Sequence, residues 1–278
     1  MKNKKNRSRR GFLGVTKQKF RWVPNTLTLC NSWCGFAAIL WTLTVYERNA
    51  HIYDILSVSA LIILGAMIFD VLDGFAARML NATSMHGLQM DSLADMVTFG
   101  VAPAVLMAVM THKLQDQQTA QQIMLTYFLC AIYLGCAALR LATYNVHALL
   151  EKKDTGKFHG LPSPGAAAAI VSMVLAVRGY EGNLSWLASV LPGYAAVLGI
   201  LMISPLPYIH MGKWLLSVRP KKPVKMLMLL AGVTLVALFR ENAIFCIVTL
   251  YVLSGPMVGL FNLFKCGHFI VPSKEEAA

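Results

Sequence analysis

The 26 residues from Asp70 to Asp95, DVLDGFAARMLNATSMHGLQMDSLAD, decide how this chain is to be interpreted. They hold four of its 13 acidic residues, and each pair of aspartates adjoins a long apolar run. The run ILSVSALIILGAMIF precedes Asp70, and MVTFGVAPAVLMAVM follows Asp95. Charged side chains within apolar helical runs are costly, and those that persist usually have a function. We therefore expect two membrane-spanning helices that carry one acidic site between them.

The spacing of the four aspartates places each pair on one face of a helix. Asp70 and Asp73 are three residues apart, and Asp91 and Asp95 are four apart; both separations share a helix face. Four converging carboxylates repel one another unless cations lie between them, and the few nearby basic residues do not neutralise four charges. Hard divalent ions prefer such oxygen ligands. The sequence therefore predicts a site for Mg²⁺ or Mn²⁺.

Small residues and one arginine accompany the aspartates. Gly74 and Ala77 continue the face that begins at Asp70, and Gly87 lies one turn before Asp91. Missing side chains there allow a ligand to approach the backbone closely. Arg78 lies one turn beyond Gly74, and its guanidinium can bind a phosphate through two parallel hydrogen bonds. A metal site, a cation and a smooth wall together suit a substrate that carries a pyrophosphate.

The pattern Asp-x-x-Asp-Gly-x-x-Ala-Arg, eight residues, Gly-x-x-x-Asp-x-x-x-Asp resembles the signature of the CDP-alcohol phosphotransferase family. All eight fixed positions match: Asp70, Asp73, Gly74, Ala77, Arg78, Gly87, Asp91 and Asp95. The resemblance implies transfer of a phosphatidyl-type group from a CDP-linked lipid to an alcohol, with release of CMP. It also implies that Asp70 and Asp91 bridge two metal ions, that Asp73 and Asp95 complete one ion each, and that Asp95 takes the proton of the alcohol.

The nucleotide side of the site is expected from the same resemblance. Gly74, Ala77, Arg78 and Gly87 would line the nucleotide and pyrophosphate. The stretch PNTLTLCNSWCGF resembles the family's PNxxT segment, which places Asn25 and Thr28 beside the cytidine nucleotide. Helix capping by Asn25 or Thr26 explains the same residues equally well. Ser84, in the connection between the two aspartate helices, could donate to a phosphate or simply shape the turn.

The second half of the chain indicates the alcohol. LRLATYNV and FHGLPSPGAA resemble segments of the family's phosphatidylserine-forming subgroup, with two departures, at Thr143 and Gly165. This resemblance implies CDP-diacylglycerol as donor and L-serine as acceptor. The carboxylate of serine requires a cation, for which Arg140 is the first candidate, with Asn145 beside it. Arg140 could equally be an ordinary basic anchor at a membrane surface.

Composition sets the fold class. Hydrophobic residues make up 56% of the chain, charged residues 14%, and the mean hydropathy is +0.57. These values indicate an all-α, polytopic membrane bundle, which we expect to have about eight transmembrane helices and a polar cavity facing the cytoplasm. Gly100 and Pro103 are expected to bend the third helix. The expected spans are 27–46, 54–78, 91–110, 122–141, 165–177, 184–202, 226–239 and 243–264.

Three regions are expected along the chain: a basic arm over 1–24, which could begin an interfacial helix, a transferase domain over 25–264 and a polar tail over 265–278. With eight spans, 21 of the 25 Lys and Arg residues fall on the side of both termini and of the aspartates. This asymmetry predicts a multi-pass protein of the cell membrane with termini and active site in the cytoplasm. The net charge of +12 suits anionic membrane lipids rather than nucleic acid. The family resemblance implies a homodimer.

Other functions stay open from the sequence alone. Within the family, the acceptor could be glycerol phosphate, inositol phosphate or choline, and the donor could be an archaeal lipid. A divalent-cation transporter would use the same carboxylates, but it needs a polar route through spans whose outer halves are almost wholly apolar. A membrane prenyltransferase usually has two separated acidic motifs with other spacings, and it leaves the Gly-x-x-Ala-Arg segment unexplained.

Overall fold

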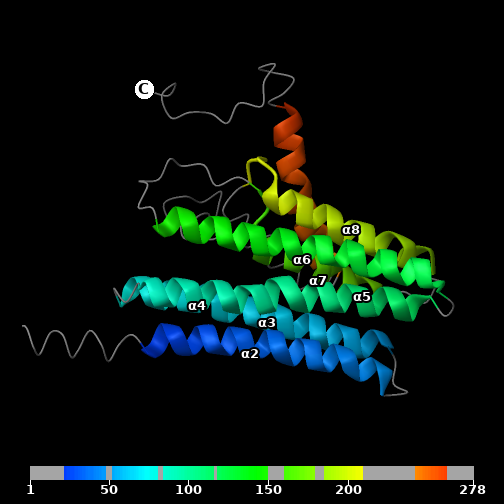
Figure 1. The fold of residues 1–278 in the computed structure, drawn as a ribbon, viewed down its shortest axis with the longest axis horizontal. Helices are drawn as coiled ribbons and strands as arrows, with labels where there is room; N and C mark the ends of the chain where they lie inside the picture. The colour runs from blue at the N-terminus through cyan, green and yellow to red at the C-terminus, as the bar shows by residue number, and fades with distance from the viewer. Residues whose placement is uncertain are drawn as a thin grey trace, which may run out of the picture.

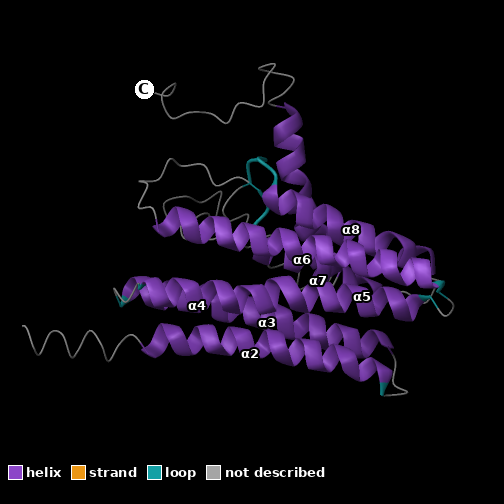
Figure 2. Cartoon of the chain, viewed as in Figure 1, coloured by secondary structure: helices purple, strands orange, loops and turns teal. Residues whose placement is uncertain are grey.

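A computed structural model describes residues 22–47, 52–80, 84–115, 118–149, 160–178, 185–208 and 242–261. All regular structure within these residues is helical (Figure 2), which confirms the all-α class. The elements are α2 (Trp22–Leu43), the 3₁₀ turn η1 (Thr44–Tyr46), α3 (Ile52–Met79), α4 (Met85–Asp95), the π-helical turn η2 (Met96–Val101), α5 (Ala102–Leu114), α6 (Ala120–Leu149), α7 (Ser163–Val177) and α8 (Ser185–Ile203). A further helix covers Asn242–Phe261.

Within the described residues, six helical stretches are long and apolar enough to cross a membrane, which confirms a multi-pass bundle. They are Trp22–Tyr46, Ile52–Met79, Met85–Leu114, Ala120–His147, Trp186–Ile203 and Asn242–Phe261. The expected fifth span is the apolar helix α7, which has only 15 residues and is therefore shorter than a membrane crossing usually needs. The expected seventh span, 226–239, lies outside the described residues.

The helices form one antiparallel pair and one parallel pair, which two further helices join. α2 packs along α3, and α6 packs along α8, while α5 and α7 contact helices of both pairs (Figure 1). The helix Asn242–Phe261 crosses the other helices steeply in the same view. Fully buried side chains from α3, α5, α6, α7 and α8 fill the interface between the pairs. They include Ile63, Leu106, Tyr133, Ile170 and Leu198.

The first helix begins earlier than expected. α2 starts at Trp22 instead of Leu27, and Pro24 lies in its first turn, where a missing backbone N–H leaves no intrahelical hydrogen bond unmade. Thr26 Oγ1 donates to the Trp22 carbonyl oxygen at 2.7 Å. The alternative that Asn25 or Thr26 caps this helix is therefore wrong, because both residues lie inside it.

The connection between the aspartate helices is also shorter than expected. The expected spans leave residues 79–90 between them, as a turn or broken helix, but α3 continues to Met79 and α4 begins at Met85. Ser84 is the N-cap of α4, and its Oγ accepts a hydrogen bond from the Gly87 backbone N–H at 3.0 Å. Asp91 consequently lies in the middle of a helix instead of at its start.

α6 extends beyond its predicted end. The expected span stops near 141, whereas the helix continues to Leu149. Asn145, which the expected span leaves in a polar loop between 141 and 165, therefore lies on the last turns of α6. Most of that loop, residues 150–159, lies outside the described residues. The extra turns carry polar side chains of α6 alongside α4, which bears one of the aspartate pairs.

The π turn η2 lies where the third span was expected to bend; it includes Gly100 and directly follows Asp95. Pro103 lies in the first turn of α5, and it has no N–H to donate to the carbonyl of Phe99, four residues earlier. Tyr133 from α6 is fully buried and donates its hydroxyl to that carbonyl at 2.7 Å. A neighbouring helix thus satisfies the backbone group that proline leaves without a donor.

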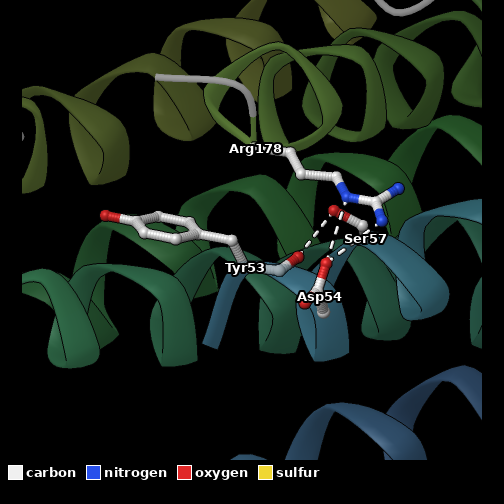
Figure 3. A network of polar contacts seen from close by, with 4 residues as sticks. All are labelled: Tyr53, Asp54, Ser57 and Arg178. Atoms are coloured by element: carbon white, nitrogen blue, oxygen red, sulfur yellow. Dashed lines mark hydrogen bonds and ion pairs between the residues drawn. The ribbon is translucent and has the colours of Figure 1, made fainter. Parts of the chain in front are cut away.

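At the opposite end of α3, an ion pair connects its first turn to the end of α7. Arg178 contacts Asp54 Oδ1 through Nε at 3.2 Å and Nη2 at 3.1 Å (Figure 3). Ser57 Oγ donates to the Tyr53 carbonyl at 2.6 Å beside this pair. This polar network orients the start of α3 relative to α7.

The start of α7 is fixed by a short backbone pairing with the segment after α8. Gly160 N–H donates to the Leu206 carbonyl at 2.8 Å, and Leu161 N–H donates to the Leu201 carbonyl at 2.9 Å. Gly160 has a φ of 95°, a left-handed conformation that glycine adopts without strain. Gly160 and Leu161 therefore have a structural role at the entrance to α7.

Candidate metal centre

Three carboxylates from two helices converge at one end of the bundle. Asp70 lies near the end of α3, and Asp91 and Asp95 lie on α4. One oxygen from each of the three side chains lies within 4.8 Å of the others. Asp95 is buried, whereas Asp70 and Asp91 are partly buried. The helical spacing seen in the sequence thus produces a compact acidic cluster between sequential helices.

Asp73 lies outside this group of three. Its Oδ2 accepts a hydrogen bond from Thr28 Oγ1 of α2 at 2.8 Å, and both side chains are buried. It still lies close enough to Asp70 and Asp91 for their negative charges to repel one another. The four predicted ligands therefore occupy one region, with Asp73 turned toward α2.

Asp95 has a partner that the sequence analysis missed. Asn31 of α2 donates its Nδ2–H to Asp95 Oδ1 at 3.2 Å, and Asn31 is fully buried. A signal was present in the sequence, since Asn31 is three residues from Thr28 and lies in an apolar span. Polar residues at that separation share a helix face, and inside a membrane span they usually face other helices.

The donor set fits a divalent cation with oxygen ligands. Among the described residues, no Lys, Arg or His forms an ion pair with any of the four aspartates. Asp91 Oδ1 is buried and has no hydrogen-bond partner among these residues. A buried carboxylate oxygen without a partner is costly, and clustered carboxylates are the ligands that Mg²⁺ and Mn²⁺ prefer. A bound cation would satisfy that oxygen and reduce the repulsion.

Three of the residues predicted to bind the nucleotide lie together at the start of α4. A Cβ atom added at Gly87 would lie 3.2 Å from Ser84 Oγ and 3.8 Å from Asn25 Oδ1. The glycine therefore brings the N-terminus of α4 close to the first turns of α2. The first turn of a helix offers unpaired N–H groups that bind anions well.

Arg78 and Gly74 contact each other on α3. Arg78 is exposed, and its Nε donates to the Gly74 carbonyl at 2.8 Å. Ala77 is partly buried on the same turn. The arginine predicted to bind a phosphate is thus folded back along its own helix, and its Nη atoms have no hydrogen-bond partner among the described residues.

The two candidate acceptor residues have different surroundings. Asn145 Oδ1 accepts a hydrogen bond from Ser92 Oγ at 2.9 Å, which places Asn145 beside the residue that follows Asp91. Arg140 Nη1 donates instead to the Met202 carbonyl at the end of α8, at 2.9 Å. The structure therefore brings Asn145 to the aspartate helix and Arg140 to the end of α8.

The two departures from the subgroup pattern lie in different surroundings. Thr143, where the subgroup has an arginine, is exposed and donates to the Leu139 carbonyl of its own helix at 2.8 Å. Gly165, where the subgroup has alanine, faces the ring of Tyr251, and an added Cβ would lie 3.1 Å from Tyr251 Cε1. The missing methyl group at Gly165 provides space for that ring.

Comparison with known proteins identifies what the chain is similar to. The family model for CDP-alcohol phosphatidyltransferase matches residues 21–204. That range contains all four aspartates and every element from α2 through α8.

Individual relatives carry more detailed names. The CDP-diacylglycerol–serine O-phosphatidyltransferase of Bacillus subtilis (strain 168) is 32% identical over 69% of this chain and 92% of its own length. The protein of that name from Helicobacter pylori (strain J99) is 29% identical over 92% of this chain and 96% of its own length. A Saccharomyces cerevisiae protein with the same name is 37% identical over 56% of this chain, and the match spans only 54% of the yeast protein.

Proposed function

Because this chain belongs to the CDP-alcohol phosphatidyltransferase family, we propose that it transfers the phosphatidyl group of CDP-diacylglycerol to L-serine and releases CMP. The observation that carries the proposal is the convergence of Asp70, Asp91 and Asp95 within 4.8 Å in a chain of this family. The names of its bacterial relatives support the choice of serine.

The aspartates would hold two divalent ions, Mg²⁺ or Mn²⁺. Asp70, Asp91 and Asp95 already lie together, and Asp73, which Thr28 orients by a hydrogen bond to Oδ2, would complete the set. Such ions, when bound, stabilise negative charge on the reacting phosphate and on the departing CMP. The chain itself supplies the oxygen ligands, the surrounding apolar helices and the hydrogen bonds that orient the carboxylates.

Asp95 would act as the general base. In the proposed reaction, the serine hydroxyl oxygen forms a bond to the phosphorus of the phosphatidyl group. The bond from that phosphorus to the bridging oxygen of the pyrophosphate breaks, and CMP leaves with the electron pair. The hydroxyl proton passes to Asp95, which is buried and returns the proton to solvent. A positioned carboxylate typically contributes about 10²–10⁴-fold to such a step.

Two groups of side chains would bind the substrates. The nucleotide and pyrophosphate would contact the predicted set of Asn25, Thr28, Gly74, Ala77, Arg78, Ser84 and Gly87. The proximity of Gly87 to Ser84 and Asn25 supports this set, whereas Thr28 would act through its bond to Asp73. The serine carboxylate would contact Arg140 and Asn145, and the bond between Asn145 and Ser92 supports a position near the metals.

We also propose a placement in the cell. The distribution of Lys and Arg in the sequence favours both termini and the aspartates on the cytoplasmic side of the cell membrane. Anionic membrane lipids would contact the basic segments. The family resemblance supports a homodimer.

The test measures CMP release by the purified full chain in detergent. CDP-diacylglycerol and Mg²⁺ or Mn²⁺ are supplied with L-serine, glycerol 3-phosphate, myo-inositol 1-phosphate or choline in parallel. We expect release with L-serine, and we expect an Asp95→Asn variant to lose it. The exposed Asp54→Asn variant is the matched control, because it changes one carboxylate at the opposite end of α3.

Each alternative gives a different result. Release with another acceptor would retain the aspartate chemistry and reject serine as the substrate. Release only with an archaeal CDP-linked lipid would change the donor. No release under any of these conditions would reject the transferase proposal. The orientation in the membrane needs a separate test. Cysteines introduced into the two termini would be labelled in intact cells, and the side from which they react would show where the termini lie.

A further inference from the structure

The buried face of α2 carries polar groups that reach the aspartates of other helices. Its buried positions recur every three or four residues and form a single stripe. They are Pro24, Thr28, Asn31, Gly35, Ala38 and Thr42. Two of them donate to carboxylates, Thr28 to Asp73 at 2.8 Å and Asn31 to Asp95 at 3.2 Å. α2 contributes none of the clustered carboxylates, yet it contacts one aspartate from each motif pair.

The stability of the fold does not explain why the residue at position 31 is the polar Asn31. Its relative exposure is 0%, and its Oδ1 has no hydrogen-bond partner among the described residues. A buried polar atom without a partner costs about 1–3 kcal/mol. An apolar side chain of similar size would avoid that cost. Among the described residues, the Asn31 side chain makes one hydrogen bond, the donation to Asp95 Oδ1.

The backbone on both sides of this hydrogen bond is held in place. Thr98 lies in η2, three residues after Asp95, and its Oγ1 donates to the Asn31 carbonyl at 3.0 Å. Gly35 permits this approach, since a Cβ there would lie 2.8 Å from Thr98 Cα. On the other side, Tyr133 donates to the Phe99 carbonyl. The π turn is thus fixed between α2 and α6 directly beside Asp95.

We propose that Asn31 is a positioning residue for the general base of the transfer reaction. By donating to Oδ1, it fixes the rotation of the Asp95 carboxylate and leaves Oδ2 for the metal and for the acceptor hydroxyl. The effect on turnover rests on the proposed function, whereas the effect on the metal site does not. Partners that orient a metal ligand typically change metal affinity or activity by about 10–100-fold when they are removed.

The test compares Asn31→Leu with Thr42→Val in the full chain. Thr42 is buried on the same stripe and donates only to the Ala38 carbonyl of its own helix, so its variant controls for loss of a buried polar group on α2. Three quantities are measured: the unfolding temperature, Mn²⁺ binding by electron paramagnetic resonance in the absence of substrate, and CMP release at saturating metal.

For Asn31→Leu we expect Mn²⁺ to bind about 10-fold or more weakly and kcat to fall about 10–100-fold. The KM for CDP-diacylglycerol should change by no more than about threefold, because Asn31 does not contact the nucleotide residues. The unfolding temperature should change little, because the variant removes the unpartnered amide oxygen but also leaves Asp95 Oδ1 without its donor. A purely structural role would lower the unfolding temperature together with the activity.

Three results would overturn the proposal. The first is that Asn31→Leu has a Mn²⁺ affinity and a kcat within twofold of those of Thr42→Val. The second is a loss of Mn²⁺ affinity and kcat in proportion to a lower unfolding temperature. If the leucine variant does not fold, Asn31→Ala is measured in the same way. The third is an equal loss of Mn²⁺ affinity when Asn31→Leu is added to Asp95→Asn, because a residue that acts through Asp95 has no effect there. Failure of the native protein to release CMP would reject the proposed function but would leave the Mn²⁺ results decisive for Asn31.

Discussion

The two ends of α3 surround an aspartate with opposite charges. At its start, Asp54 pairs with Arg178, and the two side chains are 57% and 42% exposed. At its other end, Asp70 joins Asp91 and Asp95 in a cluster that no cation of the described residues neutralises. The described residues supply a cation for the exposed carboxylate and none for the three clustered ones, so the cluster is suited to a cation from solution. The first end connects helices, and the second end is the proposed metal site.

Removal of divalent metal should have the largest effect on activity, and it should act at the acidic end of α3 only. We expect EDTA to abolish CMP release completely, and we expect Mg²⁺ or Mn²⁺ to restore it, because the clustered aspartates need an external cation. Metal should also raise the unfolding temperature, since a ligand at 100 times its Kd stabilises the folded state by about 2.7 kcal/mol. Activity that persists after exhaustive chelation would contradict a metal centre at the aspartates.

Substitution of one clustered carboxylate should have the next largest effect. Asp91→Asn should lower kcat/KM by at least about a thousandfold, which corresponds to about 4 kcal/mol of transition-state stabilisation, and should remove the stabilisation by Mn²⁺. Asp54→Asn should leave kcat/KM within about twofold, because an exposed ion pair contributes little. Both variants are measured by steady-state CMP release and by thermal unfolding. An equal loss of kcat/KM in the two variants would contradict the distinction between the two ends of α3.

The close contact of α2 with the π turn should tolerate no added methyl group. Gly35→Ala would place a Cβ 2.8 Å from Thr98 Cα and 3.1 Å from Thr98 Cβ, and overpacking of this kind costs about 1–3 kcal/mol. Gly65→Ala is the matched control on α3, because nothing lies within 4 Å of its added Cβ, and alanine favours a helix by up to about 1 kcal/mol. Thermal unfolding that ranks the two variants in the reverse order would contradict the described packing.

The smallest effect is expected at the ion pair itself. Arg178→Ala should lower the free energy of unfolding by no more than about 1 kcal/mol, because both partners are largely exposed. Its effect should diminish as the salt concentration rises, since salt screens exposed charges. CMP release should stay within about twofold of the native value. A loss of activity after this substitution would show that the two ends are coupled, and the comparison would then need revision.

Some errors of the sequence analysis have local physical causes. The start of α4 at Met85 was missed because Ser84 is not followed by Glu or Gln at the third helical position, where Gly87 stands instead; the sequence signature of a reciprocal cap is therefore absent. The end of α6 was placed too early because Asn145 resembles the beginning of a polar loop. In the structure Asn145 contacts Ser92, so packing against α4 stabilises turns that their polarity alone would not favour.

The helical membrane class, the two aspartate faces and the family signature could all be predicted from the amino-acid sequence. These features follow from composition and from the 3.6-residue helical period, both of which are local properties of the chain. Only the tertiary structure decided which groups each of these side chains meets. Asp73 turns to Thr28, Asp95 to Asn31 and Arg140 to Met202. Hydrogen-bond partners so distant in sequence depend on how the helices pack, and no spacing along a single helix specifies that arrangement.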